Sequence, residues 1–188
     1  MKAVVQRVRW AQVEVDGRLV GRIERGLLLY AGVAVGDSAQ EAGKLADKVA
    51  NLRIFEDEGG KLNRSVQDVR GGVLAISNFT LLADARKGRR PAFVGAAPQE
   101  TAGPVFECLV AALRATGLLV AQGVFGATMH IRSEADGPVN ILLDVGAPAP
   151  GDSPRSGDSP LPDDSPLPGD PPLPGDSPAR GPAPPEGA

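Results

Sequence analysis

The stretch that decides the fold is GVLAISNFTL, residues 72–81, and the cationic segment RKGRRPAF, residues 86–93, follows it closely. The apolar run after the opening glycine predicts a buried strand that ends near Ser77. The end of a strand holds hydroxyls and backbone amides rigidly, and the segment that follows carries charges suited to phosphate groups. This layout favours a site that does chemistry on a group attached to a nucleic acid.

Upstream of this strand, the sequence predicts hairpin-linked strands. Strand-like residues 2–8 and 12–15 lead into residues 19–23 through Asp16-Gly17, a preferred dipeptide of tight hairpin turns. The short apolar run at residues 27–33 predicts a central buried strand.

Two helices are predicted. Ser38 and Glu41 form a capping-box pattern, and apolar residues recur at helical spacing to about Asn51. Pro98 begins a second helix, which closes at Gly117. Two final strands at 127–132 and 139–144, joined by a turn at Asp136-Gly137-Pro138, complete an α+β domain with two main helices and a largely antiparallel sheet. The apolar stripe of the second helix consists of Val105, Phe106, Leu109, Val110 and Leu113.

The composition changes sharply after Gly146. Residues 147–188 repeat a six-residue unit close to Gly-Asp-Ser-Pro-Leu-Pro. Their seven acidic and two basic residues give a net charge of −5, so residues 1–146 carry +2 within the chain's total of −3. A segment without aromatic residues buries too little surface to offset its chain entropy, so we expect a globular domain at 1–146 and a disordered tail at 147–188. Ser-Pro and Pro-x-x-Pro patterns leave open a docking role for this tail, with its partner unknown.

Residue types that carry chemistry are scarce, which excludes several kinds of site. One Cys and one His leave little material for a disulfide framework, a zinc site or a Ser-His-Asp relay. No apolar run could span a bilayer and no signal peptide is present, so we expect a cytoplasmic protein without a membrane partner. We expect His130 to be structural or on the surface, Cys108 to pack beside the apolar stripe, and residues 56–58 to form a solvated turn.

Three motifs each admit a structural and a functional interpretation. Ser77 and Thr80 either satisfy nearby backbone groups while Phe79 packs inward, or they help backbone amides to bind an ester carbonyl and its developing oxyanion. The cationic segment is either a solvated charge run or a set of phosphate contacts. Gly137-Pro138 is either a plain hairpin turn or a cis peptide that aims two carbonyls in one direction.

Together, these segments make residues 1–145 similar to the D-aminoacyl-tRNA deacylase family. The similarity includes MKAVVQRV at 1–8, ADKVANLRIFED at 46–57 and KGRRP at 87–91. The family's Ser-Gln-Phe-Thr-Leu motif stands here as SNFTL at 77–81, and its Asn-x-Gly-Pro-Val-Thr region stands as ADGPVN at 135–140. Asn78 in place of Gln and Asn140 in place of Thr are departures within these motifs, and they concern turnover and chiral strictness more than the fold.

The resemblance implies a barrel-like fold and a homodimer that uses neither metal nor cofactor to hydrolyse the ester joining a D-amino acid to tRNA, with glycyl-tRNA mischarged on tRNA-Ala as a second substrate. It also implies that the Gly137-Pro138 peptide is cis, enters the partner subunit's pocket and rejects L-amino acids. Water attack would depend on the terminal ribose 2′-hydroxyl. The resemblance assigns catalysis and carbonyl binding to Ser77, Asn78, Phe79 and Thr80. It assigns contacts with tRNA phosphates to Arg86, Lys87, Arg89 and Arg90. Arg7 would brace the Gly-Pro peptide, and Ala102 and Met129 would line the terminal-adenosine pocket.

Two alternatives stay open. The first is a catalytically weak or silent RNA-binding dimer, inactivated by Asn78 and Asn140 and recruited through its proline-rich tail. The second is Thr80 as a covalent nucleophile, although the sequence offers no base to activate its hydroxyl.

Overall fold

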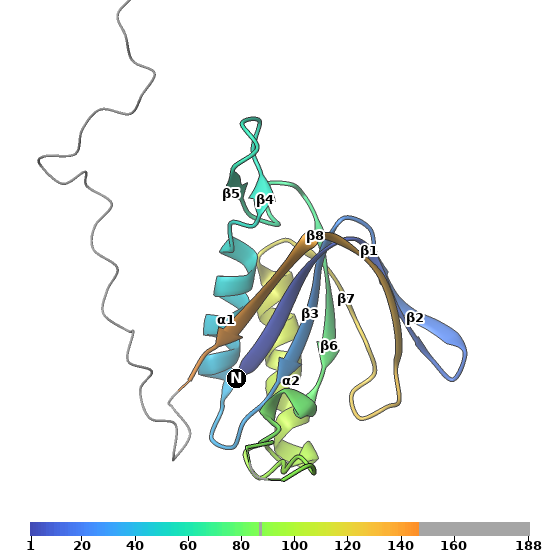
Figure 1. Cartoon of the computed structure of the whole chain (residues 1–188), viewed down its shortest axis with the longest axis vertical. Helices are drawn as coiled ribbons and strands as arrows, with labels where there is room; N and C mark the ends of the chain where they lie inside the picture. Colours follow the sequence, from blue (N-terminus) through green and yellow to red (C-terminus); the bar gives the residue numbers. More distant parts are fainter. Residues whose placement is uncertain (87, 147–188) are drawn as a thin grey trace, which may run out of the picture. The chain divides into compact units, whose positions relative to one another are not determined.

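The structure, a computed structural model, describes residues 1–86 and 88–146. Strands lie at both ends of this part of the chain, and the helices come between them (Figure 1). Lys87 and the expected tail at 147–188 lie outside the described residues. The elements are β1 (Lys2–Val15), β2 (Arg18–Ile23), β3 (Gly26–Gly32), α1 (Ala39–Asn51), β4 (Phe55–Glu56), β5 (Leu62–Arg64), β6 (Gly72–Ser77), the 3₁₀ helix η1 (Phe79–Leu82), α2 (Gln99–Ala115), β7 (Leu119–Gln122) and β8 (His130–Asp144).

Six of the strands form one mixed sheet that curves into a nearly closed barrel. β1 pairs antiparallel with β2, β3 and β8, whereas β6 pairs parallel with both β3 and β7. The prediction of an α+β fold with two main helices is confirmed, but the sheet is more mixed than expected. Parallel neighbours need a crossover between them, and here α1 lies between β3 and β6, while α2 lies between β6 and β7.

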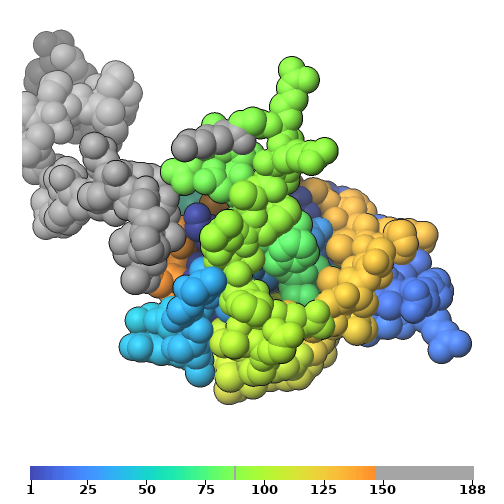
Figure 2. Space-filling view, turned by 90° about the horizontal axis from the view of Figure 1, so that it is seen from below, coloured from blue at the N-terminus to red at the C-terminus, as the bar shows by residue number. Residues whose placement is uncertain are grey.

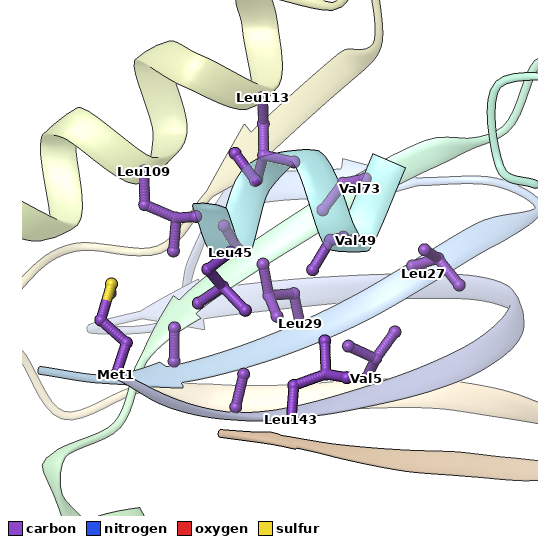
Figure 3. Packing of buried hydrophobic residues seen from close by; sticks show 14 of the residues in the cluster. Met1, Val5, Leu27, Leu29, Leu45, Val49, Val73, Leu109, Leu113 and Leu143 are labelled. Carbon is purple, nitrogen blue, oxygen red and sulfur yellow. The ribbon is translucent and has the colours of Figure 1, made fainter. Parts of the chain in front are cut away.

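The central strands are apolar throughout because both faces of the sheet are buried. Leu27 and Leu29 of β3 belong to the cluster that the two helices cover, whereas Leu28 belongs to a second cluster with Leu74 of β6. Figure 3 shows the first cluster, in which side chains of α1 and α2 pack over the sheet. Successive side chains of a strand point to opposite faces, so the run at 27–33 had to be apolar without a break.

α1 begins and ends where the sequence predicts. Ser38 caps the helix: its Oγ accepts the N–H of Gln40 at 3.1 Å, and the Glu41 carboxylate accepts the N–H of Ser38 at 3.1 Å. These two bonds satisfy backbone donors that the first turn of a helix leaves unpaired. The Ser38 hydroxyl and backbone also lower the pKa of Glu41.

β8 corrects the prediction of two strands joined by a turn at residues 136–138. It is one strand of 15 residues, paired with β1 along most of its length. Gln6 pairs with Asn140 and Val8 pairs with Ala135, so Arg7 alone stands opposite the four residues at 136–139. The Gly-Pro segment is therefore a bulge that leaves the β1–β8 ladder.

Three further predictions concern surface residues. Cys108 is exposed, so the predicted packing role is wrong: it lies two residues from buried Phe106, about 200° around the helix. His130 is exposed and pairs with Glu14 across the β1–β8 ladder, which confirms a surface histidine. Asp57 organises the predicted turn, because its carboxylate accepts the N–H groups of Gly59 and Lys61, both at 2.9 Å.

No helix among the described residues has the length and apolar character needed to cross a bilayer.

Candidate active site

The first candidate motif lies where three parallel strands end together. Ala31 of β3 pairs with Ser77 of β6, and Ala75 of β6 pairs with Gln122 of β7, so the carboxyl ends of these strands share one edge of the sheet. Figure 2 views the molecule from this end, with the green segment near residues 80–97 projecting outward. The carboxyl ends of parallel strands are where α/β sheets commonly bind ligands.

Asn78 shapes the turn that follows Ser77. Its backbone N–H donates to the Ala31 carbonyl at 2.8 Å, which ties the turn to β3. Its side-chain Oδ1 accepts the backbone N–H of Thr80 at 3.0 Å and also accepts the Thr80 hydroxyl. Asn78 is therefore the N-cap of η1, and both polar groups of Thr80 are engaged locally.

Two donors at this turn stay available. Within the described part of the chain, neither the Ser77 hydroxyl nor the backbone N–H of Phe79 makes a hydrogen bond. The Thr80 hydroxyl donates to an amide oxygen, which is not a base and does not activate it as a nucleophile. This arrangement can bind a carbonyl oxygen and stabilise negative charge on it.

The structural interpretation of this motif required Phe79 to pack inward, but Phe79 points outward. Its side chain is 58% exposed and meets the ring of Phe93 edge to face, with centroids 5.0 Å apart and planes at 68°. The turn into η1 carries Phe79 out of the sheet, so its side chain no longer alternates with those of β6. Phe93 carried no predicted role.

The cationic residues lie on a loop whose two ends are joined by backbone hydrogen bonds, and we call this junction the neck of the loop. Asp84 and Ala92 exchange two backbone hydrogen bonds, of 2.7 and 2.9 Å. Arg86 forms an ion pair with Asp84, with nitrogen–oxygen distances of 2.9 and 3.0 Å. Arg89 and Arg90 are exposed, so these two are the predicted cations best placed for phosphate groups.

Met129 and Ala102 lie toward the same end of the sheet as Ser77. A Cβ built on Gly123, directly after β7, would overlap the Met129 sulfur and lie 3.3 Å from the Cδ1 of Ile76. Ala102 lies in the first turns of α2 but is only 7% exposed and belongs to the core. Met129 is half-buried, so of these two predicted pocket residues it presents the more accessible side chain.

Arg7 holds the bulge in β8 at the opposite end of the sheet. Its guanidinium is buried, donates to the carbonyl of Ile54 at 2.7 Å and to that of Asp136 at 3.1 Å, and lies 3.2 Å from the Asp136 carboxylate. The Gly137-Pro138 peptide is cis, and Gly137 has a φ of +128°, a conformation open mainly to glycine. Arg7 thus lies beside the Gly-Pro pair through its contacts with Asp136, and the bracing role that the resemblance implies stays a prediction.

The two motifs are far apart within one chain. Arg7 pairs with Leu27 and Ser77 pairs with Ala31, so the bulge and Ser77 are offset by four residues along β3, about 13 Å. β8 and β6 are also separated by β1 and β3, which adds about 14 Å across the sheet. Figure 1 shows the bend of β1 and β8 below the β4–β5 hairpin, and the green segment that follows β6 at the lower end of the sheet.

Phe93 is the residue of this end that sequence reasoning missed. It is 14 positions from Phe79, so no helical or strand periodicity connects the two rings. The signal that could have found it is an aromatic residue three positions after a cluster of cations, a combination typical of nucleic-acid surfaces. Among residues 1–86 and 88–146, no three His, Cys, Asp or Glu side chains lie close enough together to hold a metal ion.

Comparison with known proteins identifies the family. The family model described as D-Tyr-tRNA(Tyr) deacylase matches residues 4–144. The chain belongs to this family. A D-aminoacyl-tRNA deacylase of Anaeromyxobacter dehalogenans is 56% identical over 144 residues, which cover 77% of this chain and 97% of that protein. A D-aminoacyl-tRNA deacylase of Roseiflexus castenholzii is 54% identical, with 77% of this chain and 92% of that protein covered.

Solved structures of similar proteins have the same fold. A protein described as a c-Myc DNA unwinding element binding protein is 40% identical, with a TM-score of 0.74, covering 79% of this chain and all of the other. A probable eukaryotic D-amino acid tRNA deacylase has a TM-score of 0.67 over 76% of this chain and 97% of its own. At 14% identity, this second likeness concerns the fold alone. The described residues therefore have the fold of this deacylase family.

Proposed function

We propose that this chain hydrolyses the ester that joins a D-amino acid to the end of a tRNA, releasing the free D-amino acid and the tRNA. Water adds to the ester carbonyl carbon, the bond to the ribose oxygen breaks, and that oxygen leaves with a proton. The observation that carries the proposal is the 56% identity, over nearly the full length of the relative, to a protein named D-aminoacyl-tRNA deacylase. The hydrolysis would protect translation from D-amino acids.

The open turn after β6 supports this chemistry. The Phe79 N–H and the Ser77 hydroxyl are donors at the exposed end of a rigid strand, where they would bind the carbonyl oxygen as it gains negative charge. Thr80 has no activating base, so water rather than a protein hydroxyl is the nucleophile in this proposal. The ribose 2′-hydroxyl of the substrate would orient that water.

The separation of the two motifs supports a site shared between subunits. The α-carbon and the carbonyl of an aminoacyl ester are directly bonded, so a chiral gate must lie within the same pocket as the carbonyl donors. Gly137-Pro138 and Ser77 lie at opposite ends of one chain's sheet. We therefore assign the gate to Gly137-Pro138 of a second copy in a homodimer, where its backbone carbonyls exclude L side chains and admit D-amino acids and glycine.

The cationic loop supplies the RNA contacts in this proposal. Arg89 and Arg90 would bind phosphates of the acceptor end, with a smaller part for Arg86 because Asp84 already pairs with it. Because the proposed substrate is aminoacyl-tRNA, we expect the protein to act in the cytoplasm. Since the proposed chemistry uses only protein donors, the substrate's hydroxyl and water, we expect EDTA to leave the rate unchanged.

A nucleic-acid-binding protein without hydrolytic activity is the second candidate. It is favoured by the Asn78 side chain, which takes up the Thr80 N–H and hydroxyl and so leaves fewer donors for a carbonyl. A similar protein is also described as binding a DNA element. In this case the loop would bind RNA and the turn after β6 would be inert.

Hydrolysis of matched substrates separates the two candidates. Purified full-length protein is incubated with D-, L- and glycyl-tRNA that carry the same tRNA, and the remaining ester is followed over time. We expect rapid loss of the D and glycyl esters and loss of the L ester at the no-enzyme rate. A D ester as stable as in buffer, together with intact tRNA binding, would establish the second candidate instead.

Two variants refine the result. Asn78→Ala frees the Thr80 donors but removes the cap of η1, so we expect a loss of about 1 kcal/mol in stability and a slower reaction. Asn78→Gln restores the family's residue, and a faster rate with this variant would show that Asn78 limits turnover. Equal loss of D and L esters in the wild type would keep the hydrolase but reject the gate at Gly137-Pro138.

A further inference from the structure

We infer that the edge-to-face ring pair of Phe79 and Phe93, with Arg89 and Arg90 on the adjoining loop, is a stacking platform for the unpaired nucleotides at the 3′ end of tRNA. The choice of RNA rests on the proposed function. The platform itself is argued from side chains that the carbonyl site does not require.

The exposure of the rings is the first observation. Phe79 is 58% exposed and Phe93 is 37% exposed, and the adjoining Val94 is 89% exposed. Large apolar side chains gathered at one place on a surface commonly mark a binding site. The ring contact, with centroids 5.0 Å apart, fixes the orientation of both aromatic side chains before any ligand arrives.

The base of the loop holds this platform in place. The Asp84–Ala92 pair closes the neck immediately before Phe93. Two residues beyond Phe93, the Gly95 carbonyl accepts the N–H of Val35 at 3.0 Å, and Ala97 donates to Val33 at 2.9 Å. Phe93 is therefore anchored on both sides by backbone hydrogen bonds, whereas the cations lie on the loop that the neck closes.

The chemistry of this surface matches single-stranded nucleic acid. Arg89 and Arg90 lie a few residues before Phe93 and are exposed, so phosphates and bases of one strand can meet cations and rings together. A duplex hides the faces of its bases and offers mainly phosphates to such a surface. Exposed rings therefore contribute only when the bases are unstacked, as at a single-stranded end.

Binding of uncharged RNA tests the platform separately from hydrolysis. The probes are an RNA hairpin with a single-stranded 3′ end, the same hairpin with a blunt end, and a DNA copy of the first. Each is titrated by fluorescence anisotropy at the same series of salt concentrations. We expect the wild type to bind the hairpin with the single-stranded end more tightly than the blunt one. None of the probes carries an ester, so a failure of hydrolysis leaves this result unaffected.

The variants concern Phe93, which has no part in the proposed reaction. Phe93→Ala and Phe93→Leu should weaken binding of the single-stranded end about tenfold and leave blunt binding unchanged, because stacking on one ring is lost. Phe93→Tyr keeps the ring and should bind like the wild type. Leu119→Ala is the matched control, since Leu119 is 70% exposed at the start of β7, the other end of the sheet from Ser77. Arg89→Ala should weaken both hairpins alike and reduce the salt dependence by about one ion.

Several results would overturn the inference. Equal wild-type affinity for single-stranded and blunt ends would remove the need for stacking. Loss of dimer assembly in Phe93→Leu, measured by sedimentation at unchanged RNA affinity, would make the rings an interface with a second copy. Tighter binding of the DNA probe than of RNA would assign the platform to a different nucleic acid. Unchanged RNA binding in a folded Phe93→Leu protein would leave the rings without this role.

Discussion

The two ends of the sheet are built in different ways. At the carboxyl end of β6, backbone hydrogen bonds hold the site: Ser77 continues the parallel ladder with β3, and Asn78 donates to Ala31. At the other end, the Gly-Pro bulge has left its ladder, and the buried side chain of Arg7 holds it. A ladder tolerates changes of side chain, whereas a bulge held by one guanidinium depends on that residue. Substitutions should therefore affect the two ends unequally.

The largest expected effect comes from Arg7→Ala. The change removes donors from the Ile54 and Asp136 carbonyls and leaves the Asp136 carboxylate without its closest cation, so we expect a loss of about 3 kcal/mol in the free energy of unfolding. Arg9→Ala is the matched control: Arg9 also pairs with Asp136, but its side chain is 67% exposed, so the loss should stay below about 1 kcal/mol. Urea denaturation measures both. Similar losses for the two variants would mean that burial of Arg7 does not hold the bulge.

A smaller effect is expected from Gly137→Ala. A Cβ at this position would lie 2.8 Å from the Cγ2 of Val139, and the φ of +128° disfavours any side chain, so we expect a loss of about 2 kcal/mol. Gly43→Ala in α1 is the control, because a Cβ there meets nothing within 4 Å. This second change should stabilise the protein by about 1 kcal/mol, since alanine favours a helix. A neutral Gly137→Ala would show that the bulge adapts freely.

The smallest effect concerns the turn beside the bulge and appears only in acid. Hydrogen bonds from the Asn63 side chain and the Lys61 N–H lower the pKa of Asp57 in the folded state. Its contribution to stability is therefore present above the ordinary aspartate pKa of about 3.9 and is lost as the pH falls below it, through the lowered value. Urea midpoints across this window should fall more steeply for the wild type than for Asp57→Asn. Parallel curves would mean that Asp57 does not couple this turn to folding.

Local patterns predicted much of the fold correctly. The Ser38–Glu41 cap, the Asp16-Gly17 hairpin and the buried strand β3 each depend on residues close together in the sequence. The bulge did not follow from such a pattern, because Asp136-Gly137-Pro138 has the composition of a turn. Its partner is Arg7, more than a hundred residues away, and only the pairing of β1 with β8 brings the two together.

In the candidate site, too, some features follow from the local sequence and others depend on contacts between distant residues. The position of Ser77 at the end of a strand follows from the apolar run before it. The contact between Phe79 and Phe93 and the distance from Ser77 to Gly137 depend on loop closure and strand register, which are long-range properties. Residue types therefore suggested where the chemistry lies, whereas the distance between the two motifs could be read only from the structure.

The bulge also bears on solubility. In the part of the chain that the structure describes, β8 pairs with β1 alone, so its other edge presents backbone N–H and C=O groups that could recruit further strands. An uninterrupted edge of 15 residues would be a template for aggregation. The four residues at 136–139 interrupt that edge between residues 135 and 140, so an added strand could not pair with it in one register along all 15 residues.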